Sequence, residues 1–460
     1  MPVARSLSVV EELRAALPGR VETDPARLQP YTTDRSGHRS AGAPVAAVRP
    51  RTVEDVQAVC RIASTTATPV VTRGAGTGLA GGAVAGPAEI VLCLQDMDGI
   101  LEISPENRLA VVQPGILNGD LNRALAPHGL WWAPDPASKD ISTVGGNIAM
   151  NAGGLLCAKY GVTREAVLAL KVVLADGRLL EVGHRTVKGV TGYDLCALMI
   201  GSEGTLGVIV EATLKLRPVV EGAVVTIGAF FDTVEAGAAA AAAITGAGHV
   251  AAIMELMDRP TLGCVSAHTG QDLLARGGAY LLVQCDGPAA AVTAERITEL
   301  VRSAGGTAET TVDPAASQRL VALRRAAFPA LEAMGTVLVE DICVPRDGMA
   351  AAFARIRELE DEYGVVIPTT CHAGDGNLHP TFVFDGDTVP EAVWAAAGEL
   401  FSYALEAGGT LTGEHGVGLL KRDWLAQELG PDQYDLQRRI KALFDPAGIL
   451  NPGKVFAPTP

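Results

Sequence analysis

Short apolar runs alternate with glycine-rich turns between residues 44 and 218. Runs of this length, bounded by glycine and proline, are typical of strands. A helical pattern separates two of them, at 52–65, with Thr52 at the position of a helix N-cap. The mixture predicts α+β or mixed α/β structure and not a regular series of βαβ units. The predicted strands occupy residues 46–50, 69–74, 89–94, 109–115, 168–177 and 207–218.

After Pro218 the predicted elements become longer. Strands are expected at 224–231, 279–287 and 336–345, and the histidine-containing segment 371–380 follows them. Helices that alternate with a few long strands predict an antiparallel sheet covered by helices on one face. The fold class is therefore α+β, with domains at 1–218, 219–410 and 411–460. The predicted helices lie at 233–247, 288–304, 314–333, 347–363 and 390–407, and a last helix ends near Pro446 and Gly448.

Composition narrows the range of partners. The 460 residues are 48% hydrophobic and carry a formal net charge of −15. A chain this apolar can bury a large core, whereas its negative charge argues against nucleic acid and against an anionic membrane surface. The eight cysteines include no CxxC pair, which argues against an iron–sulfur cluster or a cysteine zinc site in this chain.

Neither the N-terminus nor the alanine-rich run predicts a membrane segment. The first residues lack an uninterrupted apolar region of the kind that signal peptides have. The run at 236–248 is too short and too weakly apolar to span a bilayer. These features predict a cytoplasmic protein without a transmembrane segment.

The glycine loop at 73–82 contains a dinucleotide-binding pattern in an unexpected context. Gly76, Gly78 and Gly81 match G-x-G-x-x-G, but such a loop should open a helix, and here the glycines lead into another strand. A Rossmann fold is therefore rejected. Consecutive glycines still allow backbone N–H groups to approach a phosphate closely, and Arg73 adds a positive charge. The loop predicts a pyrophosphate site between two strands, with a flexible glycine turn as the alternative.

Two further segments, 142–161 and 201–209, are rich in glycine, and the first also contains asparagines. Such sequences are poor in the interior of a helix or strand. They suit a backbone that packs against a flat ligand, with amides as donors and acceptors.

The stretch CHAGDGNLHP, at 371–380, places two histidines around an Asp-Gly pair. A two-residue turn at Asp375 and Gly376 would set His372 directly opposite His379 on one face of a hairpin. This stretch alone is compatible with two interpretations. The histidines are two ligands of a metal site, or they belong to a polar hairpin without a metal. A third ligand from elsewhere in the chain is needed to decide between them.

Together these segments resemble the FAD-linked oxidases and dehydrogenases of the vanillyl-alcohol-oxidase fold, in the branch that oxidises D-2-hydroxy acids. That branch includes glycolate oxidase FAD subunits, D-lactate dehydrogenases and D-2-hydroxyglutarate dehydrogenases. The resemblance covers about 70–456, in the order expected. Its motifs are RGAGTGLAGGA, PDPASKDISTVGGNIAMNAGG, VKGVTGYDL, GSEGTLGVI, CHAGDGNLHP, TGEHGVGLLK and FDPAGILNPGKVF.

The resemblance implies an FAD-binding domain of two α+β subdomains at 1–218. It implies an α+β cap domain with an antiparallel sheet at 219–410, and a C-terminal segment at 411–460 that carries the catalytic loop and returns to the FAD domain. Thr77 stands where relatives with covalent flavin have a histidine, which implies non-covalent FAD. The implied cofactor residues are Arg73, Gly74, Ala75, Gly76, Thr77, Gly78, Leu79, Pro136, Ser138, Thr143, Gly146, Asn147, Asn151, Gly153, Gly204, Ile209 and Asn451.

The TGEHGVG stretch, at 412–418, supplies the missing ligand. By resemblance, His372, His379 and Glu414 hold a divalent metal, usually zinc, and three protein ligands leave positions open as catalytic sites do. The alternative is a buried cluster of histidines and glutamate joined by hydrogen bonds. His415 is the expected general base, which takes the proton of the substrate hydroxyl. Both Glu414 and His415 can serve one site only if the flanking glycines bend the chain.

Arg324 stands where the family has an arginine for the substrate carboxylate, with a solvent-facing helix charge as the alternative. Relatives that act on hydroxyglutarate have other residues at three further positions, where this chain has Phe328, Val339 and Thr381. The difference favours a short or apolar substrate such as lactate or glycolate.

Three alternatives stay open at this point. The chain is also compatible with the FAD subunit of a glycolate-oxidase-type electron-transfer complex, with a D-2-hydroxyglutarate dehydrogenase, or with a transferase that uses FAD without net oxidation. The electron acceptor is left open, with an iron–sulfur protein, an electron-transfer flavoprotein, a quinone, a cytochrome and oxygen as candidates.

Overall fold

The computed structural model describes residues 2–457 and divides the chain into two units. Residues up to 153, 161–219 and the chain from 414 form the first unit. Residues 154–160 and 220–413 form the second. Helices and antiparallel sheets occur in both, so the predicted α+β class is confirmed.

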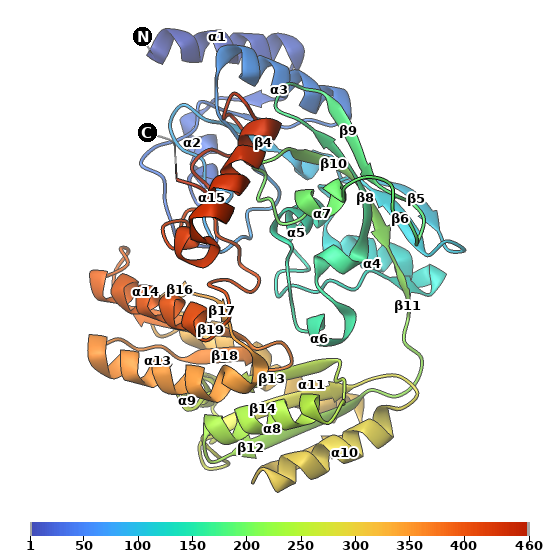
Figure 1. Cartoon of the computed structure of the whole chain (residues 1–460), viewed down its shortest axis with the longest axis vertical. Coiled ribbons are helices and arrows are strands. Elements are labelled where there is room, and N and C mark those ends of the chain that lie inside the picture. The colour runs from blue at the N-terminus through green and yellow to red at the C-terminus, as the bar shows by residue number, and fades with distance from the viewer. Residues whose placement is uncertain (1, 458–460) are drawn as a thin grey trace. The chain divides into compact units, whose positions relative to one another are not determined.

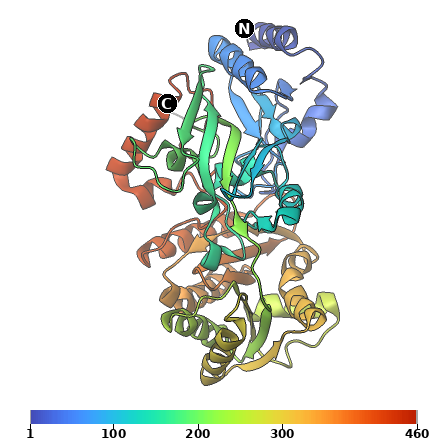
Figure 2. The same cartoon turned by 90° about the vertical axis from the view of Figure 1, so that its right-hand side faces the viewer.

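A four-stranded sheet with strand order β1-β2-β4-β3 forms one layer of the first unit. Strands β2, β4 and β3 are parallel, and only β1 is antiparallel. Helices α1 (Pro2–Ala16) and α3 (Val53–Thr66) lie side by side next to this sheet (Figure 2). The predicted cap of α3 is confirmed, because Thr52 accepts from the backbone of Asp55 in a capping box. The strands are β1 (Val21–Glu22), β2 (Ala46–Val48), β3 (Val70–Arg73) and β4 (Ile90–Cys93).

The second sheet of this unit is antiparallel, with order β5-β6-β10-β8-β9. Trp132 and side chains of β6, β8 and β10 form its core with α4 (Asn118–Leu125), α5 (Val144–Met150) and α7 (Leu195–Met199). The last helix, α15 (Leu425–Phe444), changes direction at Gly430, before Pro431. The strands are β5 (Ile100–Ser104), β6 (Leu109–Val112), β8 (Val167–Val173), β9 (Leu179–Gly183) and β10 (Val208–Lys215), and β7 (Leu130–Trp131) pairs with β11 (Arg217–Pro218).

One antiparallel sheet, of order β15-β12-β14-β13-β18-β19-β16 with β17 beside β19, organises the second unit. Its helices α8, α13 and α14 lie side by side (Figure 1). The strands are β12 (Val225–Phe231), β13 (Ile253–Met257), β14 (Ala279–Cys285), β15 (Thr307–Thr311), β16 (Thr336–Val339), β17 (Ile342–Cys343), β18 (Thr369–His372) and β19 (Asn377–Phe384). The helices are α6 (Cys157–Tyr160), α8 (Val234–Gly246), α9 (Arg259–Thr269), α10 (Ala290–Ser303), α11 (Pro314–Arg325), α12 (Ala327–Glu332), α13 (Met349–Tyr363) and α14 (Glu391–Glu406).

Helices cover both faces of this sheet, so the prediction of a single covered face was wrong. On strand β13, Ile253 and Met257 point to one face and pack with α9, α11 and α12. Leu256 points to the opposite face, where it contacts Gly237 of α8. A strand covered on both faces is apolar throughout, and periodicity alone does not reveal which of its sides carries helices.

Two predicted elements are each divided into two. The helix predicted at 314–333 is broken at Ala326 into α11 and α12. The strand predicted at 336–345 becomes β16 and β17, which are separated by the buried residues Glu340 and Asp341. This second interruption matters for the site, because it places a carboxylate inside an otherwise apolar sheet.

Candidate functional site

The two hairpin histidines share one face of the sheet, but in a different register from the predicted one. His372 faces Asn377, and His379 faces Thr370. The turn therefore spans residues 373–376, and the prediction of a two-residue Asp-Gly turn was wrong. A shift of two residues keeps side chains on the same face. The two imidazole rings meet edge to face with their centroids 4.8 Å apart.

A buried carboxylate on the neighbouring strand contacts the first histidine. Glu255 of β13 lies directly opposite His372 of β18, and its Oε1 lies 2.6 Å from Nδ1 of His372. Glu255 is 1% exposed and His372 is 7% exposed. A carboxylate at this distance fixes which imidazole nitrogen carries the proton, and the other nitrogen, Nε2, keeps its lone pair. That arrangement is common for histidines that bind metals.

Arg324, predicted to hold a substrate carboxylate, lies beside the same glutamate. Its Nε and Nη2 both lie 3.0 Å from Oε2 of Glu255. Arg324 therefore neutralises a buried carboxylate and is not the solvent-facing helix charge that was the alternative. Sequence reasoning missed Glu255, since nothing in IMELM marks its central glutamate as the partner of two distant residues.

Glu414 directly follows Gly413, the last residue of the second unit. Ligand atoms of His372, His379 and Glu414 all lie within 4.8 Å of one another. Such a set, with two imidazoles and one carboxylate, matches the donor types that zinc and related divalent ions prefer. The three residues are separated in sequence, and the structure brings them together.

The residues just before Glu414 are held by Asp341, which sits between β16 and β17. Oδ1 of Asp341 accepts a hydrogen bond of 3.0 Å from the backbone N–H of Gly413. Oδ2 accepts one of 2.6 Å from the hydroxyl of Thr412. Asn377, which faces His372, also donates to Asp341. Sequence reasoning had included Asp341 only as part of a continuous strand.

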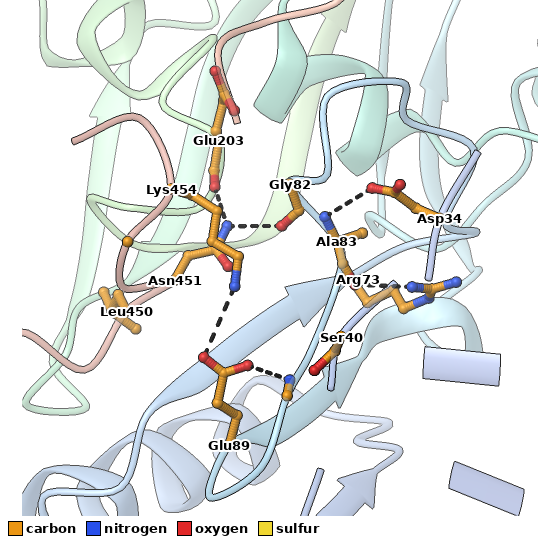
Figure 3. Close-up of polar contacts among 12 residues, drawn as sticks. Asp34, Ser40, Arg73, Gly82, Ala83, Glu89, Glu203, Leu450, Asn451 and Lys454 are labelled. Carbon is orange, nitrogen blue, oxygen red and sulfur yellow. Dashed lines mark hydrogen bonds and ion pairs between the residues drawn. The ribbon is translucent and has the colours of Figure 1, made fainter. Parts of the chain in front are cut away.

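In the first unit, Arg73 has a structural role that its sequence context did not indicate. Its Nη1 donates at 2.8 Å to the carbonyl of Ala83, which lies beside it in Figure 3. Nη1 also donates to the carbonyl of Thr33 at 2.9 Å, and Nη2 donates to that of Pro30. Burial lowers the pKa of the guanidinium, though not enough to discharge an arginine. Arg73 thus joins the glycine loop to the N-terminal segment at 30–34.

Two glycines of this loop, Gly74 and Gly76, leave no room for a side chain. A Cβ at Gly74 would lie 2.2 Å from Oγ1 of Thr143, and one at Gly76, which has φ of +73°, would lie 2.1 Å from Nη2 of Arg73. Gly78, in contrast, has open space at its Cβ position. Backbone that is stripped of side chains and faces open space is what close approach to a phosphate requires.

Four buried polar atoms near these glycines have no hydrogen-bond partner among residues 2–457. They are Thr72 Oγ1, Ser142 Oγ, Asn147 Nδ2 and Asn451 Oδ1. Buried polar atoms in native proteins are normally paired, so a group of four at a glycine-rich site fits a polar ligand. Asn147 and Asn451 are among the predicted cofactor residues, whereas Thr72 and Ser142 are additional to them.

A third buried carboxylate, Glu203, is bonded to two other segments of the first unit. The carbonyl of Glu203 accepts from Nδ2 of Asn451 at 2.6 Å, and the same amide donates to Gly82 (Figure 3). Its side chain accepts from the backbone N–H groups of Val417 and Gly418. Burial raises the pKa of Glu203 to about 7, against the opposing effect of these two N–H groups and of Lys421.

The remaining predicted cofactor residues all belong to the first unit. Thr143 caps α5 by accepting from Gly146 at 3.2 Å, and Asn151 ends that helix with φ of +50°. Ile209 belongs to the core on strand β10. Ala75, Thr77 and Leu79 follow Arg73, Pro136 and Ser138 form a turn, and Gly153 and Gly204 lie in loops.

Comparison with known proteins identifies the family. A family model described as "FAD binding domain" matches residues 44–183, and one described as "FAD linked oxidases, C-terminal domain" matches residues 221–455. The chain belongs to the FAD-linked oxidases. It is accordingly a flavoprotein oxidoreductase, as the sequence resemblance predicted.

Relatives of this FAD-linked oxidoreductase are named as enzymes of hydroxy acids. Glycolate oxidase subunit GlcD of Bacillus subtilis is 40% identical over 422 residues, which cover 90% of this chain and 89% of the relative. D-lactate dehydrogenase of Archaeoglobus fulgidus is 37% identical, over 89% of this chain and 90% of the relative. The crystal structure of p-cresol methylhydroxylase with substrate bound has the same fold, with a TM-score of 0.80 at 20% identity over 99% and 97% of the two chains.

The first unit fits FAD, since it combines the glycine positions 74, 76 and 78 with four buried polar atoms that have no hydrogen-bond partner among residues 2–457. Within residues 2–457, no helix combines the length and apolar character needed to cross a bilayer.

Proposed function

We propose that this FAD-linked oxidoreductase oxidises a short D-2-hydroxy acid, such as lactate or glycolate, to the 2-oxo acid. The observation that carries the proposal is the cluster of His372, His379 and Glu414, whose ligand atoms lie within 4.8 Å of one another. Relatives named for glycolate and D-lactate support the substrate class. A metal set with open positions suits a substrate that offers a hydroxyl and a carboxylate on adjacent carbons.

His372, His379 and Glu414 would hold a divalent ion, with zinc as the first candidate. When bound, the ion supplies a Lewis acid that lowers the pKa of a hydroxyl group. Glu255 supports this role of His372, because its carboxylate accepts a hydrogen bond from Nδ1–H and leaves the lone pair of Nε2 for a metal. The fit rests on donor chemistry, because two imidazoles and one carboxylate are ligand types that zinc and related ions prefer.

His415 follows Glu414 directly and is the proposed general base. It takes the proton from the substrate hydroxyl, while the hydrogen on Cα leaves with two electrons. FAD, when bound non-covalently in the first unit, supplies the two-electron hydride acceptor. The substrate loses one proton and one hydride, which balances the conversion of an alcohol to a ketone.

Arg324 is the proposed partner of the substrate carboxylate. Its Nε and Nη2 already meet Glu255, so Nη1 is the nitrogen that these contacts leave for a substrate. Val339, Phe328 and Thr381 stand where hydroxyglutarate enzymes have other residues, and Phe328 and Val339 bring no charge for a second carboxylate. A short substrate tail is therefore favoured over hydroxyglutarate.

The electrons need an acceptor after each turnover. A separate protein chain is favoured, because one relative is named as a subunit of glycolate oxidase and this chain has no cysteine cluster motif. An iron–sulfur protein and an electron-transfer flavoprotein are the two candidates of this kind.

Anaerobic titration of the FAD-loaded protein with a panel of hydroxy acids tests the proposal. We expect D-lactate or D-glycerate-like short acids, or glycolate, to bleach the flavin absorbance, and the L-enantiomers to leave it unchanged. Pretreatment with a chelator should slow bleaching, and added zinc should restore it. If no D-2-hydroxy acid bleaches the flavin with the metal present, the proposal is wrong.

A further inference from the structure

The segment Thr412–Gly418 is held at both ends by buried carboxylates. Asp341 of the second unit accepts from Thr412 Oγ1 and Gly413 N, just before Glu414. Glu203 of the first unit accepts from Val417 N and Gly418 N, just after His415. Glu414 and His415 are the two residues that lie between these anchored pairs.

Both anchoring carboxylates are buried, so their hydrogen bonds are shielded from water. Asp341 is 0% exposed, and Glu203 is 7% exposed. Glu203 meets the two amides at 2.7 and 2.8 Å, each with a different carboxylate oxygen. Removal of the carboxylate would leave two buried N–H groups without their acceptor.

Glu203 is itself fixed in place by its backbone. It has φ of +54°, which is rare for a residue with a side chain. Its N–H donates to Ala149 at 2.9 Å, and its carbonyl accepts from Asn451 at 2.6 Å. A residue held in a strained conformation by bonds on both sides presents its carboxylate in one direction.

The glycines of the segment leave it little freedom to rearrange. A Cβ at Gly413 would lie 2.5 Å from Nδ2 of Asn377. Gly416 has φ of +86°, and its Cβ would lie 2.5 Å from Cε of Met150 and 2.9 Å from Oε1 of Glu203. The chain passes through these positions only because they are glycine.

We propose that Asp341 and Glu203 are positioning residues, which hold the Glu414–His415 pair in the bent conformation that its chemistry needs. On an extended chain, neighbouring side chains point to opposite sides. Anchors on both sides of the pair fix its backbone. They thereby fix the directions in which the Glu414 carboxylate and the His415 imidazole point. The roles of Glu414 and His415 rest on the proposed function, whereas the anchoring itself rests on hydrogen bonds within each unit.

Substitutions of the two anchors, measured on the FAD-loaded protein, test this inference. Glu203→Gln can accept only through one oxygen and turns an NH2 group toward an N–H. Asp341→Ala removes both oxygens that accept from Gly413 and Thr412. We expect zinc affinity, measured by competition with a chromophoric chelator, to fall about tenfold or more. We expect kcat for the hydroxy acid to fall in the same range, with a smaller change in KM.

Asp445→Asn is the matched control. Asp445 is also buried in the first unit and accepts from two backbone amides, those of Ile449 and Leu450. The Asp445→Asn variant is therefore expected to lose a similar amount of unfolding free energy, measured in urea. Its zinc affinity should stay within about twofold of that of the wild type.

Hydrogen exchange of the amides of 414–418 separates this inference from the proposed function. Faster exchange there in Glu203→Gln than in Asp445→Asn supports the anchoring, even if no hydroxy acid is oxidised. If the variants bind zinc, turn over and exchange as the control does, the inference is overturned although the proposed oxidation stands.

Discussion

His372 and Glu255 face each other across strands β18 and β13, with Nδ1 of the histidine 2.6 Å from Oε1 of the glutamate. The second oxygen of Glu255 meets Arg324. One buried carboxylate therefore has two positively polarised partners, one from a strand and one from a helix. This relationship links the proposed metal ligand to the proposed substrate arginine.

Glu255→Gln should lower zinc affinity by about 10–100-fold, because the amide orients His372 less firmly and makes it a weaker donor. The measurement is competition with a chromophoric chelator, after urea unfolding has shown that the variant is folded. Glu309→Gln, which changes a half-exposed glutamate on the same sheet, is the control and should leave the affinity unchanged. A folded Glu255→Gln protein with wild-type affinity would show that His372 is not oriented for a metal.

Arg324→Met should destabilise the protein by about 3–5 kcal/mol, because it leaves Glu255 buried without a cation. Arg324→Lys keeps a charge but loses the planar fork that can meet two carboxylates at once. We therefore expect the lysine variant to keep more of the stability and to raise KM for the hydroxy acid. Urea unfolding and steady-state kinetics distinguish the effects, and an unchanged KM in Arg324→Lys would remove Arg324 from the substrate site.

The hairpin illustrates what the sequence could predict. Asp-Gly indicated a turn, and the alternation of side chains indicated that both histidines share a face. The turn proved longer by two residues, and because the side-chain period is two, the shared face survived the error. The face on which a side chain lies depends on whether its position is odd or even along the strand, which the local sequence shows. The register depends on contacts with neighbouring strands, which the local sequence does not show.

The three buried carboxylates could not be predicted in the same way. The side chains of Glu203, Glu255 and Asp341 each form hydrogen bonds with residues 36 or more positions away. A single sequence gives no indication of such pairings. The available signal was weaker: a charged residue inside an apolar strand, or between glycines as in GSEGTLG, is seldom buried without a partner.

The raised pKa of Glu203 predicts a specific dependence of stability on pH. Its pKa is about 7 in the folded protein, against an ordinary value of 4.5. The folded state thus binds the proton of Glu203 more tightly than the unfolded state does. Proton binding at Glu203 therefore stabilises the folded state fully below about pH 4.5, and this stabilisation is lost as the pH rises through 7. Relative to Glu203→Gln, the wild type should lose unfolding free energy between pH 5 and 7, by on the order of 1 kcal/mol per pH unit. Urea unfolding of both proteins across this range checks the sign, and a parallel pH dependence would contradict it.

Substitution of Arg73 can separate an effect on folding from an effect on cofactor binding. Its guanidinium donates to three backbone carbonyls, of Pro30, Thr33 and Ala83, and it is 9% exposed. Arg73→Met should therefore lower the unfolding free energy of the FAD-free protein by about 3 kcal/mol, because buried carbonyls lose their donors. Urea unfolding of the apoprotein measures this.

Arg439→Met is the control, because Arg439 is exposed and pairs with the exposed Asp435 in α15 of the same unit. An exposed ion pair contributes about 0–1 kcal/mol, so this variant should differ little from the wild type. If Arg73 instead binds the pyrophosphate directly, Arg73→Met would weaken FAD binding and leave the apoprotein as stable as the control. The contacts with three carbonyls favour the first outcome, in which weaker FAD binding follows from a loosened glycine loop.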